Sequence, residues 1–326
     1  MIIAPLDIVG VGSVAVDDLL YVAEYPPADA KARVLRRERQ CGGLTGTALV
    51  AAARSGARCG FAGVVGLDEL SDVVARQFEH VGVDTAWMAR DPAARVIYSV
   101  IVVEEQQRQR TIFYDLEGTI GVNPSWPPAE AIESARALYV DHVDAEMSLR
   151  AARMAQAANV AVIADFEYVS SPQFSELLDL VDHLILPVGF AAQLSGRSDP
   201  AEAALALGDA RRALVAVTCG AEGAWWVERE APSQPRHQPA FAVPVADTTG
   251  CGDVFHGAYA AALVRGLSAV ARLRYAAAAA ALKATRPGAQ AGIPTRAEVE
   301  AFMSSQSVVE GSRKGAETQS SACTGA

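Results

Sequence analysis

The chain has 326 residues, 51% of them hydrophobic, and its 28 lysines and arginines are outnumbered by 38 aspartates and glutamates. The formal charge of -10 disfavours nucleic acid and anionic membrane surfaces as partners, because both are negatively charged as well. The five cysteines form no Cys-x-x-Cys pair, which argues against structural zinc and favours reduced thiols in a cytoplasmic protein. A small-molecule substrate is therefore expected.

The N-terminal part begins with strand-like patterns. Residues 7–16 form an apolar run with two glycines, which predicts one buried strand. The glycines imitate a dinucleotide-binding fingerprint, but residues 19–22 are strand-like where that fingerprint requires a helix, so a dehydrogenase is disfavoured. Helices are expected over residues 48–55, after a pair of glycines, and over residues 68–81.

The middle of the chain predicts a parallel sheet. Two strands around a polar hairpin are expected at residues 95–103 and 111–114. Strands that alternate with helices predict one α/β domain, in which ligands bind at the carboxyl ends of the strands. Four short apolar runs, each followed by a turn or helix, are the expected parallel strands: residues 138–141, 160–165, 183–186 and 214–218.

A glycine-rich loop over residues 247–257 opens a helix near Val254. The backbone N–H groups of Gly250, Cys251 and Gly252 would converge at the start of this helix, where an anion such as phosphate is favoured. Asp253 is then either an acid that complements the helix dipole or a base that accepts the proton of an attacking hydroxyl. The residues alone favour the first interpretation.

Two motifs add a resemblance to a known family. The stretch from Asp247 to Phe255 resembles the signature Asp-Thr-x-Gly-Ala-Gly-Asp-x-Phe of the ribokinase-like (pfkB) carbohydrate kinases, with Cys251 in place of the usual alanine. The run from Gly42-Gly43 to Ala57 is similar to the first signature of that family. The segment Tyr25-Pro26-x-x-Asp29 resembles the ketohexokinase branch. Four stretches resemble the sulfofructose kinase branch: residues 237–241, 253–258, 282–288 and 291–294.

The resemblance implies a ribokinase-like fold. This is a three-layer α/β/α sandwich with a mostly parallel central sheet and a small β-sheet lid, here within residues 17–40 and 95–115 of a kinase domain that spans residues 1–303. The lid implies a homodimer, because lids in this family often pair between subunits. Residues 304–326 are rich in small polar residues and are expected to form a disordered tail.

The resemblance also implies an activity: ATP-dependent transfer of phosphate to a hydroxyl of a small sugar, with a ketose as one candidate. A nucleoside kinase on the same fold and a sugar-binding regulator with weak catalysis remain alternatives. Asp253 would be the general base, and Gly250, Cys251 and Gly252 the anion hole. The implied sugar contacts are Asp17, Asp29, Lys31, Gly42, Gly43 and Thr47, and the implied nucleotide contacts are Thr218, Gly220, Gly223 and Gly288.

Departures from the family pattern concern the sugar and the metal ions. Thr47 stands where many members carry Asn, and Tyr114 and Val143 stand where the Asn and Arg would accompany Lys31 around a sulfonate. The Asn-x-x-Glu that organises Mg²⁺ is replaced by residues 187–190, Pro-Val-Gly-Phe.

Other residues are therefore expected to hold the metal ions. Asp165 or Glu167 is expected to hold Mg²⁺ through water. The resemblance also implies a site for a monovalent cation, K⁺, near Asp247 and Thr249.

Overall fold

The structure is a computed structural model that describes residues 5–106 and 109–306. Its larger sheet has the strand order β14-β13-β12-β11-β10-β9-β1-β4, in which β13 alone runs antiparallel to its neighbours. The four runs expected as successive parallel strands are confirmed as β9 to β12. The strands are β1 Leu6–Val11, β4 Cys59–Phe61, β9 Ala135–Asp141, β10 Ala161–Asp165, β11 His183–Pro187, β12 Leu214–Thr218, β13 Ala224–Glu228 and β14 Arg236–Gln238.

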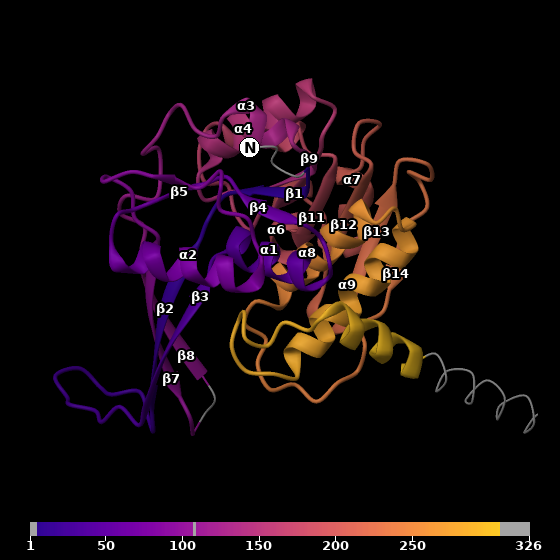
Figure 1. Ribbon diagram of the computed structural model, residues 1–326. Coiled ribbons are helices and arrows are strands. Elements are labelled where there is room, and N and C mark those ends of the chain that lie inside the picture. Colours follow the sequence, from indigo (N-terminus) through magenta and orange to yellow (C-terminus); the bar gives the residue numbers. More distant parts are fainter. Residues whose placement is uncertain (1–4, 107–108, 307–326) are drawn as a thin grey trace, which may run out of the picture.

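Helices cover both faces of this sheet (Figure 1). Apolar residues of α1, α2, α8 and α9 form a buried cluster on one face, and those of α3 to α7 form a second cluster on the other. The three-layer sandwich expected from the sequence is confirmed. The helices are α1 Leu44–Arg54, α2 Glu69–Val81, α3 Ala129–Glu133, α4 Ala145–Ala157, α5 Phe174–Asp179, α6 Val188–Ser195, α7 Pro200–Leu207, α8 Cys251–Val264 and α9 Ala269–Ala284.

A second sheet, the lid, has the strand order β3-β2-β7-β8 and projects away from the larger sheet (Figure 1). Strands β2 and β7 pair in parallel, and β3 and β8 pair antiparallel at the two edges. The lid strands are β2 Ala15–Val22, β3 Arg36–Gly42, β7 Ile97–Glu104 and β8 Gln109–Asp115, and a small separate pair joins β5 Val64–Val65 to β6 Ala89–Arg90.

Two expected element bounds are wrong. Residues 7–16 are not one strand, because Ser13 donates its N–H and its hydroxyl to Asp141 Oδ2 at 2.6 and 2.7 Å and the chain turns there from the larger sheet into the lid. Helix α1 starts at Leu44 and not at residue 48, because Gly43, with φ 84°, is itself the N-cap. A Cβ at Gly43 would lie 2.6 Å from Val14 Cα, so the close approach requires glycine.

The C-terminal end departs from the expected tail at its first residues. Residues 296–306 are helical, so residues 304–306 belong to a helix and not to a tail. Residues 307–326 lie outside the described part. No helix in residues 5–106 and 109–306 is both long and apolar enough to cross a membrane.

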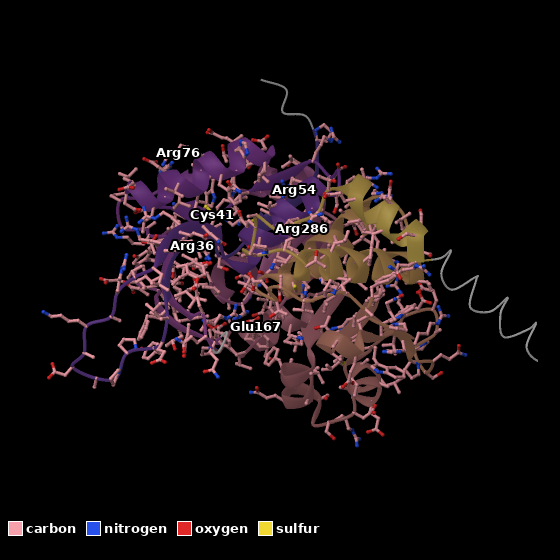
Figure 2. The ribbon with its side chains drawn as sticks, turned by 90° about the horizontal axis from the view of Figure 1, so that it is seen from below. Arg36, Cys41, Arg54, Arg76, Glu167 and Arg286 are labelled. Carbon is pink, nitrogen blue, oxygen red and sulfur yellow. The ribbon has the colours of Figure 1, made fainter. Side chains whose placement is uncertain are left out.

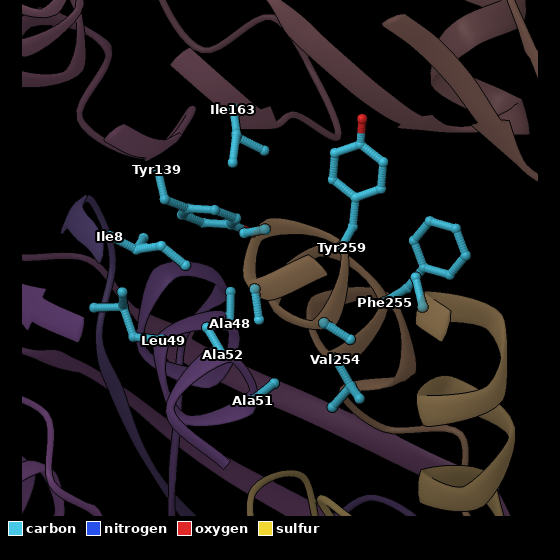
Figure 3. Close-up of a cluster of buried hydrophobic side chains, with 14 of the residues drawn as sticks. Ile8, Ala48, Leu49, Ala51, Ala52, Tyr139, Ile163, Val254, Phe255 and Tyr259 are labelled. Carbon is cyan, nitrogen blue, oxygen red and sulfur yellow. The ribbon is translucent and has the colours of Figure 1, made fainter. Parts of the chain in front are cut away.

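Helices α1 and α8 pack against each other through small residues (Figure 3). Ala48, Ala51 and Ala52 of α1 are each about 1% exposed. A Cβ at Gly257 of α8 would lie 2.1 Å from Ala48 O, so the two backbones meet at this point. Since α1 follows the glycine pair and α8 follows the glycine-rich loop, their contact sets the separation of the two motifs.

Gly257→Ala is therefore expected to destabilise the fold by about 1–3 kcal/mol, because the added methyl group forces α1 and α8 apart. Gly189→Ala is the matched control, since nothing lies within 4 Å of a Cβ there, inside α6. The control should stabilise the protein by about 0.5–1 kcal/mol through helix propensity. Urea unfolding measures both; equal effects of the two substitutions would contradict the close contact.

Candidate active site

Asp253 lies in the first turn of α8, whose N-cap is Gly250 with φ 75°. The N–H groups of a first helical turn lack intrahelical acceptors, and that of Cys251 bonds to Thr248 O at 3.2 Å. A Cβ at Gly252 would meet no atom within 4 Å, so a ligand can approach the backbone here. His256 faces Gly252 O at 2.8 Å and Ile185 O at 3.1 Å, which holds the start of α8 against the end of β11.

Carboxylates gather beside Asp253. Burial, followed by repulsion from Asp165 and Glu167, raises the pKa of Asp253 well above its ordinary value. Burial and the charge of Asp165 likewise raise the pKa of Glu167. Asp165 is buried at the end of β10, and its Oδ2 accepts the Tyr139 hydroxyl at 3.0 Å. Figure 2 looks from below onto the side that carries Glu167. Such a group of carboxylates favours both proton uptake and cation binding.

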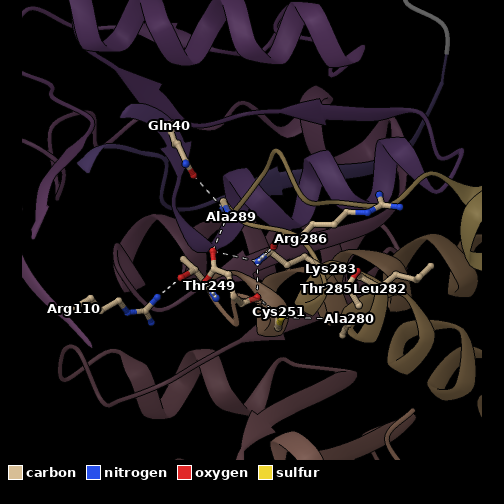
Figure 4. Close-up of polar contacts among 12 residues, drawn as sticks. Gln40, Arg110, Thr249, Cys251, Ala280, Leu282, Lys283, Thr285, Arg286 and Ala289 are labelled. Carbon is tan, nitrogen blue, oxygen red and sulfur yellow. Dashed lines mark hydrogen bonds and ion pairs between the residues drawn. The ribbon is translucent and has the colours of Figure 1, made fainter. Parts of the chain in front are cut away.

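A cleft of about 890 Å³ separates the lid from the loop before α8 and the loop after α9. Asp17 lines it from the lid, and Asp247, Thr249 and Gly288 line it from the other side. Burial raises the pKa of Asp17. Arg110 of β8 reaches across and donates a hydrogen bond to Thr249 Oγ1 (Figure 4). The lid is thus in contact with the loop that opens α8.

The glycine pair lies next to Asp17. A Cβ at Gly42 would lie 2.7 Å from Asp17 Oδ2, while Gly43 turns the chain into α1. The structure therefore brings Asp17, Gly42 and Gly43 together, as the sequence predicted.

Three expected sugar contacts do not reach the cleft. Asp29 and Lys31 are exposed on the loop between β2 and β3, which projects at the far end of the lid from α8 (Figure 1). Thr47 is fully buried inside α1, and its hydroxyl has no hydrogen-bond partner among the described residues. The resemblance aligned these positions, but their exposure and burial depend on the packing of this chain.

Thr218, Gly220 and Gly223 form the turn between β12 and β13. Thr218 pairs in register with Pro187 of β11, so the turn lies at the same sheet edge as Asp165. Gly223 has φ 95°, and a Cβ there would lie 2.1 Å from Gln238 O. These residues shape the edge of the sheet but do not line the cleft between lid and loops.

Asp247 joins two loops. Its Oδ1 accepts the Thr249 N–H and its Oδ2 accepts the Gly288 N–H, both at 2.8 Å. Burial alone would raise the pKa of Asp247, but these hydrogen bonds and Lys283 hold it below its ordinary value. The Lys283 ammonium donates to Asp247 O at 2.9 Å (Figure 4).

Sequence reasoning missed Arg110 and Lys283. Lys283 is a single charge at the end of an alanine-rich helix, where no sequence motif singles it out. Arg110 was missed because the expected strands at residues 95–103 and 111–114 leave it in the polar hairpin between them, whereas β8 begins at Gln109.

The described residues contain no group of three side chains that could hold a metal ion by themselves. The segment that replaces Asn-x-x-Glu ends β11 and begins α6, and Phe190 packs against Phe174 with ring centroids 5.8 Å apart. It offers no side-chain oxygen. Asp165 and Glu167 are carboxylates at the same edge of the sheet.

Comparisons with known proteins identify the family. Residues 6–296 match the pfkB family carbohydrate kinases. A ribokinase of Bacillus subtilis is 28% identical over 299 residues, which cover 90% of this chain and 98% of the relative. An ATP-dependent ribose-1-phosphate kinase of Halopiger xanaduensis is 31% identical over 305 residues, covering 91% and 98%. The solved ribokinase of Thermotoga maritima superposes with a TM-score of 0.79 at 26% identity, covering 92% and 99%.

These relatives are not ketohexokinases or sulfofructose kinases, so the family is shown and the expected branch is not. Because the match spans nearly all of the described chain and includes the loop that opens α8, the chain belongs to the pfkB family of carbohydrate kinases and is an ATP-dependent phosphotransferase that acts on an alcohol group of a sugar.

Proposed function

We propose that the enzyme phosphorylates a hydroxyl of a ribose-type pentose, with Asp253 as the general base. The observation that carries this assignment is the raised pKa of Asp253 at the head of α8, next to backbone that a ligand can approach. The pentose follows from the relatives, which are named as ribokinases and a ribose-1-phosphate kinase. The four free cysteines among the described residues fit a cytoplasmic enzyme.

Asp253 accepts the proton of the sugar hydroxyl as its oxygen attacks the γ-phosphorus of ATP. The bond from that phosphorus to the β,γ-bridging oxygen breaks, and ADP leaves with the electron pair. The first-turn amides at Gly250, Cys251 and Gly252 stabilise the charge of the transferring group. Arg110 brings a guanidinium to the same loop from the lid, where it adds positive charge and excludes water.

The residues present fit a bound Mg²⁺, since the carboxylates of Asp165 and Glu167 repel each other in its absence and can hold it through water. When bound, Mg²⁺ neutralises charge on the β- and γ-phosphates.

Sugar and nucleotide enter from opposite sides. Asp17 and the backbone of Gly42 and Gly43 accept hydrogen bonds from the sugar hydroxyls and thereby orient the sugar. The nucleotide lies along the sheet edge between the turn that contains Gly220 and Gly223 and the loop at Gly288. Asp29 and Lys31 take no part in this arrangement because they are exposed on the loop between β2 and β3, and Thr47 takes no part because it is buried inside α1.

Asp253→Asn is expected to lower kcat by about 10²–10⁴-fold, because the base is lost while the side chain keeps its shape. ATP binding measured by calorimetry should stay within about twofold. Asp199→Asn is the matched control, since it replaces the N-cap of α7 with another good N-cap residue. Near-normal turnover of the Asp253 variant would refute the assignment.

ADP release measured over a panel of acceptors tests the substrate. Ribose is expected to give the highest kcat/KM, followed by ribose 1-phosphate, with fructose and adenosine at least about tenfold lower, the discrimination that a few lost polar contacts provide. Preference for fructose would support the ketohexokinase-like branch, and preference for adenosine the nucleoside kinase. Binding of sugars without turnover of any acceptor would support the regulator.

We also propose that the enzyme is a homodimer through the lid. Strand β8 is an edge strand, and its Ile112, Phe113 and Tyr114 are 46%, 51% and 68% exposed. Exposed apolar edge strands favour pairing with another copy. Sedimentation velocity at micromolar concentration is expected to show a dimer that Phe113→Lys converts to a monomer. Val270→Lys on α9 is the control, because Val270 is 52% exposed away from the lid; a monomeric native protein would contradict the proposal.

A further inference from the structure

Lys283 carries a buried charge in an otherwise apolar helix. Its side chain is fully buried near the end of α9, in a helix whose buried residues are mostly alanine. The ammonium donates to Asp247 O at 2.9 Å and to Arg286 O at 3.3 Å, and it lies 3.7 Å from Asp247 Oδ2 (Figure 4). All three neighbours are oxygen acceptors, which is the surrounding that a cation requires.

These oxygens belong to the two loops that flank the phosphate site. Asp247 precedes the glycines that open α8, and Arg286 precedes the turn at Gly288. The Asp247 carboxylate completes the connection, since it accepts the N–H groups of Thr249 and Gly288. The backbone adds a third connection, because the N–H groups of Ala246 and Asp247 both point to Ala284 O, at 2.8 and 3.1 Å. The Lys283 ammonium therefore lies among three oxygens, Asp247 O, Asp247 Oδ2 and Arg286 O, which we call the oxygen cage.

This cage is where the resemblance placed a monovalent cation, at Asp247 and Thr249. A K⁺ ion would need the same inward-facing oxygens: backbone carbonyls and the Asp247 carboxylate. The ammonium already occupies them, and a second cation beside it would be repelled. The residues of this chain thus do not fit a bound K⁺.

We propose that Lys283 permanently replaces the monovalent cation, so that its ammonium positions the anion-binding loop against the loop at Gly288 and the enzyme needs no K⁺. The kcat measurements below rest on the proposed kinase function, whereas the Tm measurements do not. Lys283 acts through Asp247 and the backbone and does not touch the substrate, so it is a positioning residue. Its pairing with Asp247 is mutual: burial lowers the pKa of Lys283, and the Asp247 charge opposes that shift.

The native enzyme gives the first test. Its Tm and kcat are compared in KCl, NaCl and tetramethylammonium chloride at equal ionic strength. We expect Tm to agree within about 1 °C and kcat within about twofold among the three salts. The reason is that no cation binds the native state specifically, so none stabilises it more than the others. A saturable rise of Tm or kcat with K⁺ alone would overturn the proposal. The thermal measurement needs no sugar, so its outcome is independent of the acceptor assignment.

Lys283→Ala gives the second test, because it empties the cage and leaves its oxygens in place. In tetramethylammonium chloride, kcat is expected to fall at least about tenfold, as for a misplaced anion-binding loop. KCl or NH₄Cl should then raise both the Tm and the kcat of this variant, which is the rescue that a purely structural lysine would not show. Arg153→Ala, an exposed cation on α4 in the opposite helix layer, is the matched control and should show no response to K⁺.

A Lys283→Ala variant with native kcat and no thermal response to K⁺ would refute the positioning role. Should that variant fail to fold, Lys283→Arg and the native salt series decide, because the arginine keeps the charge and should remain insensitive to K⁺.

Discussion

The buried carboxylate of Asp141 is the contact on which the arrangement of the site depends. Its Oδ2 accepts hydrogen bonds from the N–H and hydroxyl groups of Ser13 and Thr45, at distances between 2.6 and 3.3 Å. One oxygen atom thereby joins the end of β9, the crossing from β1 into the lid, and the first turn of α1. A Cβ at Gly12 would lie 2.5 Å from this oxygen, so only glycine lets the backbone come so close. The lid and the helix layer are positioned relative to the sheet by the same atom.

The loop that opens α8 contains two aspartates with opposite pKa shifts. The pKa of Asp247 is lowered, because two backbone N–H groups and Lys283 stabilise its charge against burial. The pKa of Asp253 is raised, because burial and the carboxylates of Asp165 and Glu167 destabilise its charge. Environments that shift the pKa values of two carboxyl groups in opposite directions give these groups different roles. Asp247 remains an anion that organises the loop, while Asp253 can take up and release a proton.

Local patterns predicted the parts of the molecule that depend on local physics. The apolar runs that became β9 to β12 are buried on both faces, so composition alone identifies them. The glycine pair before α1 and the loop before α8 were found because glycines cluster there, and Gly43 and Gly250 adopt positive φ values of 84° and 75° that favour glycine. Thr47 was expected to contact the sugar, and Lys283 was not singled out, for the opposite reason. Whether a polar side chain on an alanine-rich helix faces solvent, a ligand or a cage of carbonyls is decided by distant segments.

Two departures from the family pattern change how positive charge reaches the phosphate site. Phe190 stands where the family pattern has a glutamate and packs into the apolar cluster beside Phe174. In the proposed mechanism, Mg²⁺ would therefore be held by the carboxylates that also surround Asp253. Lys283 supplies a charge that elsewhere would come from a free ion. An ion occupies its site only when its concentration exceeds its dissociation constant, whereas a covalently attached ammonium is always present. Desolvation of that ammonium destabilises the folded state, and its interactions with Asp247 and two carbonyls offset this effect. Because the ammonium is always present, the anion-binding loop is formed before any ligand binds.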